Sequence, residues 1–369
     1  MSKALETQLE INLSALAHNY HFLKSKLHAA TKMMAVVKAF GYGSDAVEVS
    51  KELEKLGVAY FAVAYANEGV ELRNAGIKSP ILVLHPLPTN FNVIIERCLE
   101  PSIYSLKMLE GFLSFAKQKN QTDYPVHLKI NTGLNRLGFS ENEISEALKI
   151  ITSQSYIKVR SIFSHLAASE DPNEKEFTER QLKLFSNISE TIISALPYKP
   201  FRHTLNTSGI INYPEAQYDL VRSGIGLYGF GNDKTITAQL QPVATLKTVI
   251  SQIHELQPGD TLGYNRAFKV VSKTRTATLP IGHADGISRA YGNGVGWVTI
   301  NNKKAPIQGN VCMDMIMVDV TNIDCKEGDE VIVFGTVSTA ENLSNEINSI
   351  PYELITAISQ RIKRVVHRI

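Results

Sequence analysis

The chain has 369 residues, of which 44% are hydrophobic and 20% charged, so it is long enough for one large soluble domain and a second, smaller one. Its 38 basic residues nearly balance its 36 acidic ones, and the net charge of +2 argues against a nucleic-acid or membrane-surface partner. The 3 cysteines form no CxxC pair, which argues against a disulfide scaffold or a cysteine-rich zinc site. The first residues lack the apolar core of a signal peptide, and no apolar run approaches the ~18 residues of a membrane span. We therefore expect a cytoplasmic enzyme or binding protein.

The first two thirds of the chain alternate short apolar runs with helix-like stretches. The runs are rich in Val, Ile and Leu, which is typical of strands buried on both faces, and helical crossovers between them indicate parallel pairing. Eight such strands predict a (β/α)8 TIM barrel, with a doubly wound open sheet as the alternative. The predicted strands are Met33–Val37, Tyr60–Tyr65, Pro80–Leu84, Pro101–Ser105, Val126–Ile130, Val159–Leu166, Phe201–Asn206 and Tyr218–Ile225. The clearest predicted helices are Leu13–Leu27, Asp45–Leu56, Tyr104–Lys119 and Glu174–Leu196.

The alternation of apolar runs and helix-like stretches ends after Gly229, where a turn-rich linker leads into segments rich in Val, Ile and Thr. Such segments, bounded by turns, predict a mostly antiparallel C-terminal β domain. We place the barrel domain at 1–235 and the β domain at 236–369, with the first strand, Glu6–Leu13, a candidate to pack with the C-terminal domain. The predicted β segments are Thr245–Ile253, Thr274–Ile281, Gly296–Ile300, Ile316–Val320 and Glu330–Phe334, and a helical or mixed segment covers Tyr352–Arg364.

Lys38 directly follows the first predicted barrel strand, at the end of the barrel where such enzymes carry their function. Burial lowers the pKa of a strand-end lysine toward that of a nucleophilic amine. Gly41 and Gly43, in the same stretch, allow the backbone to approach a ligand closely. From position alone, a lysine that simply reaches into solvent remains the alternative.

Further candidate groups follow later barrel strands. Each one by itself is also explained as a packed core residue or as part of an ordinary loop. Together they place a candidate imine-forming lysine, several cations and a phosphate cradle on one face of the barrel, which is the set that pyridoxal 5′-phosphate requires. These groups are Lys129, Arg136, His165, Thr207, Ser208, Gly224 and the amide of Ile225.

Nine motifs cover nearly the whole chain, from about Ile11 to about Arg364. In order they are VVKAFGYG, HLKINTGLNRLG, FSHLA, NTSG, VRSGIGLYG, GDTLGYNRAF, PIGHADGISR, PIQGNVCMDMIMVD and PYELITAIS. In this order and spacing the sequence resembles the alanine racemase family, which are barrel-type pyridoxal-phosphate enzymes with a C-terminal β domain. The resemblance implies an isomerase that interconverts L- and D-alanine and supplies D-alanine for peptidoglycan.

The resemblance also implies roles for individual residues. Lys38 would form the Schiff base to the cofactor, Arg136 would reach its phenolic oxygen, and Arg222 would face its pyridine nitrogen. A guanidinium is a donor only and cannot stabilise a protonated pyridine as a carboxylate would, which favours simple proton return over transamination. The other implied cofactor-binding residues are Tyr42, His165, Asn206, Thr207, Gly224, Ile225 and Tyr352.

Tyr264 matches the second catalytic base of the family, which acts on the substrate face opposite Lys38. A phenol has a pKa near ~10, and positive charge along a chain through His165 and Arg222 would lower it. Tyr264 lies in the predicted β domain and Lys38 in the barrel, and in the family these two residues meet across a homodimer with shared sites. The implied substrate-binding residues are Arg136 and, from the partner subunit, Met313 and Asp314.

Some positions depart from the usual family pattern. The lysine that matches Lys129 is carbamylated in many members. Here Asn131 and Asn135 replace an acidic residue and a glycine, so a carbamylated and an unmodified Lys129 both remain open. His283 and Asn310 stand near the substrate entry, where many members have a tyrosine and an arginine. Because of these two residues, the alternative remains that the protein is a related barrel-type racemase of broader specificity or an amino-acid decarboxylase. A non-catalytic cofactor-binding protein is disfavoured, because such proteins resemble the barrel alone. We expect no metal site.

Overall fold

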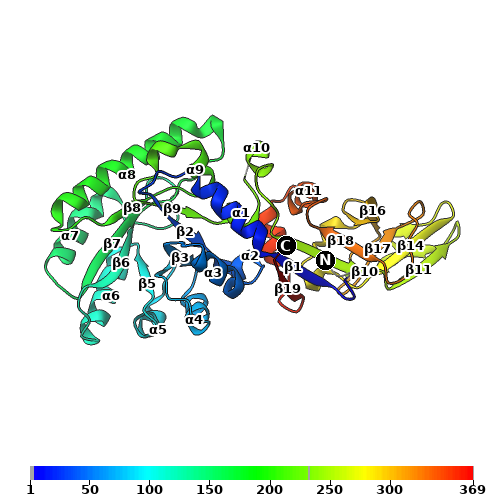
Figure 1. Ribbon diagram of the computed structural model, residues 1–369, viewed down its shortest axis with the longest axis horizontal. Helices are drawn as coiled ribbons and strands as arrows, with labels where there is room; N and C mark the ends of the chain where they lie inside the picture. The colour runs from blue at the N-terminus through cyan, green and yellow to red at the C-terminus, as the bar shows by residue number, and fades with distance from the viewer. Residues whose placement is uncertain (1–3, 232, 369) are drawn as a thin grey trace.

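The computed structural model describes residues 4–231 and 233–368, so the outer ends of the two predicted domain ranges lie outside the described residues. The molecule has two lobes, a barrel wrapped by helices and a sheet-rich lobe, and the two chain ends lie near their junction (Figure 1). Within the described residues, no helix is both long and apolar enough to cross a membrane.

Eight parallel strands form the nearly closed barrel. From β2 to β8 each strand pairs with the next along the chain, and the last strand, β9, pairs with the first, β2. Backbone hydrogen bonds across the remaining gap, from Asp219 N to Arg202 O and from Arg222 N to Leu205 O, link β8 to β9. The barrel prediction is therefore confirmed and the open-sheet alternative is wrong. The strands are β2 (Lys32–Val36), β3 (Tyr60–Val63), β4 (Ile81–Val83), β5 (Glu100–Ile103), β6 (Tyr124–Lys129), β7 (Ile157–Phe163), β8 (Phe201–His203) and β9 (Leu220–Ser223).

Helices follow most of the strands and cover the outside of the barrel, with the long helix α8 along one edge (Figure 1). Several begin where a polar side chain accepts from the first free backbone amides, as Asn12 does for α1 and Asp45 for α3. The helices are α1 (Leu13–Lys24), α2 (Lys38–Tyr42), α3 (Ala46–Lys55), α4 (Ala66–Asn74), α5 (Phe91–Glu96), α6 (Leu106–Gln118), α7 (Ile144–Thr152), α8 (Lys175–Ala195) and α9 (Thr207–Asn212).

The second lobe is built on a sheet of nine strands whose pairings are antiparallel except for β1 with β19. In spatial order the strands are β11 (Gln252–Leu256), β14 (Thr274–Leu279), β17 (Ile316–Asp319), β16 (Lys303–Gln308), β15 (Trp297–Ile300), β18 (Glu330–Phe334), β10 (Ala244–Val249), β1 (Gln8–Asn12) and β19 (Lys363–His367). The sheet thus includes the first strand of the chain, while the boundary at 235/236 stays a prediction. The small elements β12 (Thr261–Leu262), β13 (Phe268–Lys269), α10 (Lys234–Thr237), α11 (Ala340–Asn345) and α12 (Pro351–Ala357) complete the chain.

Two details of the C-terminal lobe correct the sequence prediction. The segment predicted as one strand over Thr245–Ile253 is two strands, because the chain changes partner there: Ile250 N bonds to Asp329 O, whereas Ser251 N bonds to Thr278 O. The final mixed segment resolves into the short helix α12 and the strand β19.

Candidate functional site

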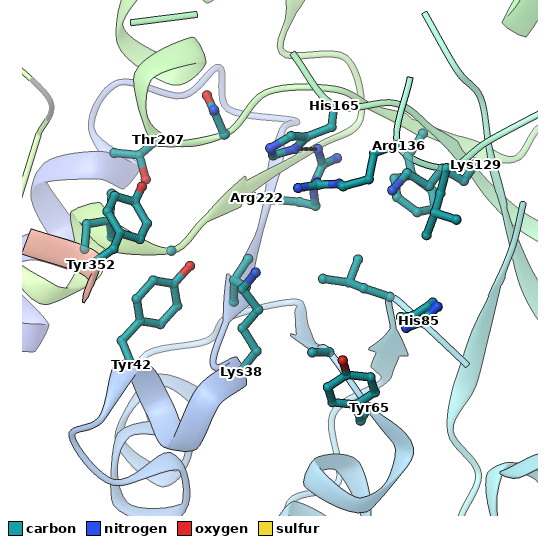
Figure 2. A pocket seen from close by; sticks show the side chains of 18 of the residues that line it. Lys38, Tyr42, Tyr65, His85, Lys129, Arg136, His165, Thr207, Arg222 and Tyr352 are labelled. Carbon is teal, nitrogen blue, oxygen red and sulfur yellow. Dashed lines mark hydrogen bonds between the residues drawn. The ribbon is translucent and has the colours of Figure 1, made fainter. Parts of the chain in front are cut away.

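A cavity of about 520 Å³ opens at the carboxyl end of the barrel strands. Val36, Lys129 and Phe163, the last residues of β2, β6 and β7, lie in its wall. Figure 2 shows Lys38, Arg136 and Arg222 pointing into this common space, with Tyr42, Thr207 and Tyr352 together on one side. The lining residues are Val36, Lys38, Tyr42, Ala64, Tyr65, Leu84, His85, Lys129, Arg136, Leu137, Phe163, His165, Asn206, Thr207, Ser208, Arg222, Gly224, Ile225 and Tyr352.

Lys38 sits where β2 ends in a tight turn. The three residues after it, Ala39 to Gly41, have left-handed φ values of 54°, 55° and 61°, an arrangement that costs energy and is concentrated at functional sites. Glu68 stabilises this turn, because its Oε1 accepts from Ala39 N at 2.6 Å while its Oε2 accepts from Ala64 N at 2.7 Å. Burial, and then the nearby Arg136 charge, lower the pKa of Lys38, against an opposing effect of Glu68. The amine is therefore held as a candidate nucleophile and proton carrier.

The cavity is strongly cationic. Lys38, Lys129, Arg136 and Arg222 line it, and no carboxylate is among the described residues that do so. Lys129 is only 6% exposed, and burial, followed by the charges of Arg136, Arg222 and Lys38, lowers its pKa to about 8. Uncompensated buried cations are costly, so this donor set is suited to a ligand that carries several negative charges.

The lowered pKa of Lys129 predicts a pH-dependent stability. Between about 8 and the ordinary 10.5, the unfolded chain binds the lysine proton and the folded protein does not, so raising the pH through this window stabilises the fold. Below about pH 8, the free energy of unfolding of the wild type should be lower than that of Lys129→Met by up to about 3 kcal/mol. This difference should vanish as the pH approaches 10.5. The difference is measured by denaturant unfolding in buffer free of carbon dioxide. Lys158→Met is the control, because Lys158 is an exposed lysine of β7. A deficit that is constant across this pH range would contradict the shift.

A cradle without bulky side chains lies beside Tyr42. A methyl group added at Gly224 would lie 2.2 Å from Tyr42 Oη, and one added at Gly226 would lie 2.5 Å from Thr207 Cγ2. Tyr42 stacks on Tyr228 with ring centroids 4.6 Å apart, and burial raises its pKa well above the ordinary value, so the phenol keeps its proton and can donate it. The hydroxyls of Tyr42 and Thr207 beside a bare glycine backbone are suited to phosphate oxygens.

Arg222 and His165 form the floor of the site. Arg222 Nη2 donates to Ser164 O at 2.7 Å and to Thr204 O at 2.9 Å, and it lies 3.2 Å from His165 Nδ1 (Figure 2). Because the guanidinium only donates, His165 accepts at Nδ1 and carries its proton on Nε2. Burial, followed by the Arg222 charge, lowers the pKa of His165 well below its ordinary value, so the ring is neutral.

The structure brings most of the predicted site residues together and leaves three apart. All the predicted barrel residues and Tyr352, contributed by α12, line the cavity. Asn206 also caps α9, accepting from Gly209 N at 2.9 Å. Tyr264, Met313 and Asp314 instead line a separate depression on the C-terminal lobe, where Tyr264 is 73% and Met313 59% exposed.

Sequence reasoning missed Tyr65 and His85 on the cavity wall. Each lies two residues beyond the end of a barrel strand, Tyr65 after β3 and His85 after β4. Their position just beyond the end of a barrel strand could therefore have identified them as residues of the cavity wall.

The fold and the site define a two-lobed barrel enzyme with a buried lysine in a cavity built for an anionic ligand. Residues 11–231 match the family model for the alanine racemase N-terminal domain, and residues 243–366 match the model for its C-terminal domain. The chain belongs to the alanine racemase family.

Curated and solved relatives agree with this assignment over the full length. The alanine racemase of Helicobacter acinonychis strain Sheeba is 39% identical over 97% of this chain and 98% of that protein. The structure of alanine racemase from Clostridium difficile 630 has a TM-score of 0.92 at 33% identity, and it covers 100% of this chain and 97% of that one. The structure of alanine racemase from Bartonella henselae with covalently bound pyridoxal phosphate has a TM-score of 0.89 at 29% identity, over 99% and 100% of the two chains.

Proposed function

We propose that this protein racemises alanine with pyridoxal 5′-phosphate, by a two-base mechanism that uses Lys38 and Tyr264 from opposite sides of the substrate. The observation that carries the proposal is the cavity itself. It combines two lysines of lowered pKa, two arginines and a glycine backbone beside two hydroxyl groups, with no carboxylate among its described lining residues. Relatives with the alanine racemase name span the full chain, and the Bartonella structure holds the cofactor covalently.

The residues of the cavity fit this cofactor. Lys38 would hold the aldehyde, Arg136 the phenolic oxygen and Arg222 the pyridine nitrogen. The phosphate would lie beside the Gly224 backbone, which Tyr42 Oη approaches closely because no Cβ intervenes, with oxygens that accept from hydroxyls and backbone amides. The residues assigned to the phosphate are Tyr42, Thr207, Gly224, Ile225 and Tyr352, and Asn206 and His165 complete the binding set.

When bound, pyridoxal phosphate withdraws electrons from the α-carbon of an attached amino acid and so acidifies its α-proton. Lys38 Nζ, with its lowered pKa, would take or return that proton on one face. Arg222 makes five hydrogen bonds to carbonyl and imidazole acceptors, which fix its guanidinium in place. Burial lowers its pKa to about 9, so it still carries its charge near neutral pH. A charged donor at the ring nitrogen limits charge delocalisation and favours rapid proton return.

The second proton carrier would come from another copy of the chain. Lys38 lies in the barrel cavity, and Tyr264 lies on the exposed face of the other lobe beside Met313 and Met315. One subunit therefore does not present both groups in one cavity. A homodimer that covers this partly apolar face would bring Tyr264 to the partner's cavity, opposite Lys38. There, backbone groups of Met313 and Asp314 and the guanidinium of Arg136 would hold the substrate carboxylate. Arg361 Nη2 keeps the Asp314 side chain in place at 2.7 Å.

Lys129 is the group we propose to be carbamylated. A pKa of about 8 leaves a substantial neutral fraction of this amine near physiological pH, which can add to carbon dioxide with release of a proton, and the resulting anion would compensate the neighbouring guanidinium of Arg136. Protein equilibrated with 13C-bicarbonate should show a carbamate carbon signal by NMR, and Lys129→Met should lack it. A wild-type spectrum with no such signal would refute the modification.

Filling the phosphate cradle should weaken cofactor binding. Gly224→Ala adds a methyl group that would lie 2.2 Å from Tyr42 Oη, on a backbone whose ψ of −93° lies outside the usual helical and extended regions. We expect the dissociation constant for pyridoxal phosphate to rise roughly 10- to 100-fold, measured by absorbance titration of the apoprotein. Gly111→Ala is the matched control, because its methyl group would meet only Phe91 Cε2 at an ordinary 3.6 Å. Equal affinities for the two variants would exclude Gly224 from the cradle.

Racemisation itself is tested by incubating the purified protein with L-alanine in D₂O. The circular dichroism of the amino acid should decay to zero while deuterium enters the α-position. An unchanged signal without deuterium incorporation refutes the proposal. The activity would supply D-alanine for peptidoglycan in the cytoplasm.

A related enzyme of broader specificity, or a decarboxylase, is the second candidate. It is favoured by His283 and Asn310, which by the family resemblance would stand near the entry, where many members have a tyrosine and an arginine. Asn310 also has a structural role, because its Nδ2 donates to Tyr264 O at 3.1 Å and so stabilises the loop that carries Tyr264, the proposed second base. A substrate panel separates the candidates: faster turnover of serine or lysine than of alanine, or release of carbon dioxide, would favour the second.

A further inference from the structure

A chain of five buried polar side chains crosses the interior of the barrel, one from each of the strands β5 to β9. Arg222 Nη1 lies 2.7 Å from His203 Nδ1, and His203 Nε2 lies 2.9 Å from Ser161 Oγ. Ser161 Oγ lies 2.6 Å from His127 Nδ1, and His127 Nε2 lies 2.7 Å from Glu100 Oε2. None of the five is more than 9% exposed. The mechanism above uses only Arg222.

The two ends of this chain determine the direction of every hydrogen bond. A guanidinium only donates, so His203 accepts at Nδ1 and carries its proton on Nε2, which donates to Ser161. The serine hydroxyl then donates its single hydrogen to His127 Nδ1. His127 in turn donates from Nε2 to the Glu100 carboxylate, which only accepts when ionised.

The opposite direction creates a conflict inside the barrel. If His127 donated from Nδ1, Ser161 would donate to His203 Nε2. The His203 proton would then lie on Nδ1, and two donors would face each other across the 2.7 Å to Arg222. Buried donors without acceptors are costly, so this arrangement would displace the guanidinium. The low pKa of His203, caused by burial and then by Arg222, agrees with a neutral ring.

Glu100 is itself held as an acceptor. Tyr60 Oη donates to Glu100 Oε2 at 3.2 Å, and the same hydroxyl accepts from Arg160 Nε at 3.0 Å. The phenolic hydrogen is thereby directed at the carboxylate. Two donors, Tyr60 Oη and His127 Nε2, thus converge on one carboxylate oxygen.

We propose that Glu100 and Ser161 are positioning residues of the racemase site: they keep the Ser161 hydroxyl turned to accept from His203 Nε2, which holds His203 in place as the acceptor that orients Arg222. The other nitrogen of the same guanidinium, Nη2, lies 3.2 Å from Nδ1 of His165, which lines the cavity, so a change in the orientation of Arg222 directly alters the cavity wall. The catalytic consequence rests on the proposed function. The tautomer of His203 is a property of the fold and can be tested without it.

Ser161→Ala is the decisive variant, because it removes the link between the two histidines with little change in volume. Ser102→Ala is its matched control. Ser102 is also fully buried on a barrel strand, in register with His127, and its hydroxyl has no hydrogen-bond partner among the described residues. Both are compared as purified holoproteins.

Two measurements are made on each variant. The side-chain nitrogen spectrum of 15N-histidine-labelled protein should show His203 as the Nε2–H tautomer in the wild type and Ser102→Ala, and should change in Ser161→Ala. The kcat for alanine should fall roughly tenfold in Ser161→Ala, with KM within about twofold, and stay within about twofold in Ser102→Ala.

Glu100 is tested by a pair of substitutions. The amide oxygen of Glu100→Gln can still accept from His127, so kcat should be largely retained, whereas Glu100→Leu should lose about tenfold. A His203 signal unchanged in Ser161→Ala, or equal kcat for Ser161→Ala and Ser102→Ala, would overturn the inference. If the wild-type holoprotein does not racemise alanine, the proposed function fails, and the histidine spectra alone decide the inference.

Discussion

Replacing Lys38 by alanine should abolish racemisation in both directions, with a loss of about 10³-fold or more in kcat. The reason is that Lys38 has two roles in the proposed mechanism, as the covalent anchor of the cofactor and as one of the two proton carriers. Neither Lys129 nor the arginines that line the cavity stand, as Lys38 does, directly before a turn of three left-handed residues. The variant should also lose covalent attachment of pyridoxal phosphate.

Attachment is measured independently of activity by borohydride reduction and peptide mapping. The wild type should yield one modified peptide that contains Lys38, and Lys38→Ala should yield none. Lys32→Ala is the control, because Lys32 lies at the opposite, exposed end of the same strand β2. Recovery of a modified peptide at another lysine, with racemisation intact, would show that the anchor is wrongly assigned.

Tyr264→Phe should leave cofactor attachment intact and lower kcat by about 10²- to 10⁴-fold, because it removes only the hydroxyl that handles the proton on the second face. In D₂O the variant should still exchange the α-proton of the enantiomer served by Lys38, which we assign as D-alanine. L-alanine should not exchange. Exchange of both enantiomers at wild-type rates would rule out the two-base assignment.

The same variant tests whether the site is shared between subunits. In a mixed dimer of Lys38→Ala and Tyr264→Phe, one cavity carries both defects and the other carries neither. Random exchange of subunits makes half the dimers mixed, so a mixture of the two inactive proteins should recover about a quarter of wild-type activity. No recovery, with subunit exchange shown by native mass spectrometry, would mean that each subunit supplies both groups itself.

The barrel was predictable because its strands carry a local pattern. Runs such as Met33–Val37 and Tyr60–Tyr65 are apolar on both faces, as parallel strands under helices must be, and all eight predicted runs overlap a barrel strand. The C-terminal lobe was less predictable. Strand β11 is mostly exposed and β16 carries lysines and a proline, so neither has the apolar run by which a buried strand is recognised.

The candidate cavity was predictable to the extent that its residues follow strands. Lys38, Lys129, His165 and Arg222 all lie at or just beyond strand ends, and closing a barrel brings such positions to one rim. The position of Tyr352 is different. Nothing local to α12 indicates that it joins the barrel rim, and only the docking of that helix beside Tyr42, with ring centroids 5.9 Å apart, places it there.

By itself the amino-acid sequence determined the barrel, the order of its strands and the family, because apolar periodicity and motif spacing are properties of short segments. Tertiary structure alone decided the protonation chemistry. The lowered pKa values of Lys38 and Lys129, the neutral His165 and the one-way chain from Arg222 to Glu100 arise from burial and from contacts between residues distant in sequence. The cost of removing a charge from water depends on everything packed around it, and no single segment of the chain contains that information.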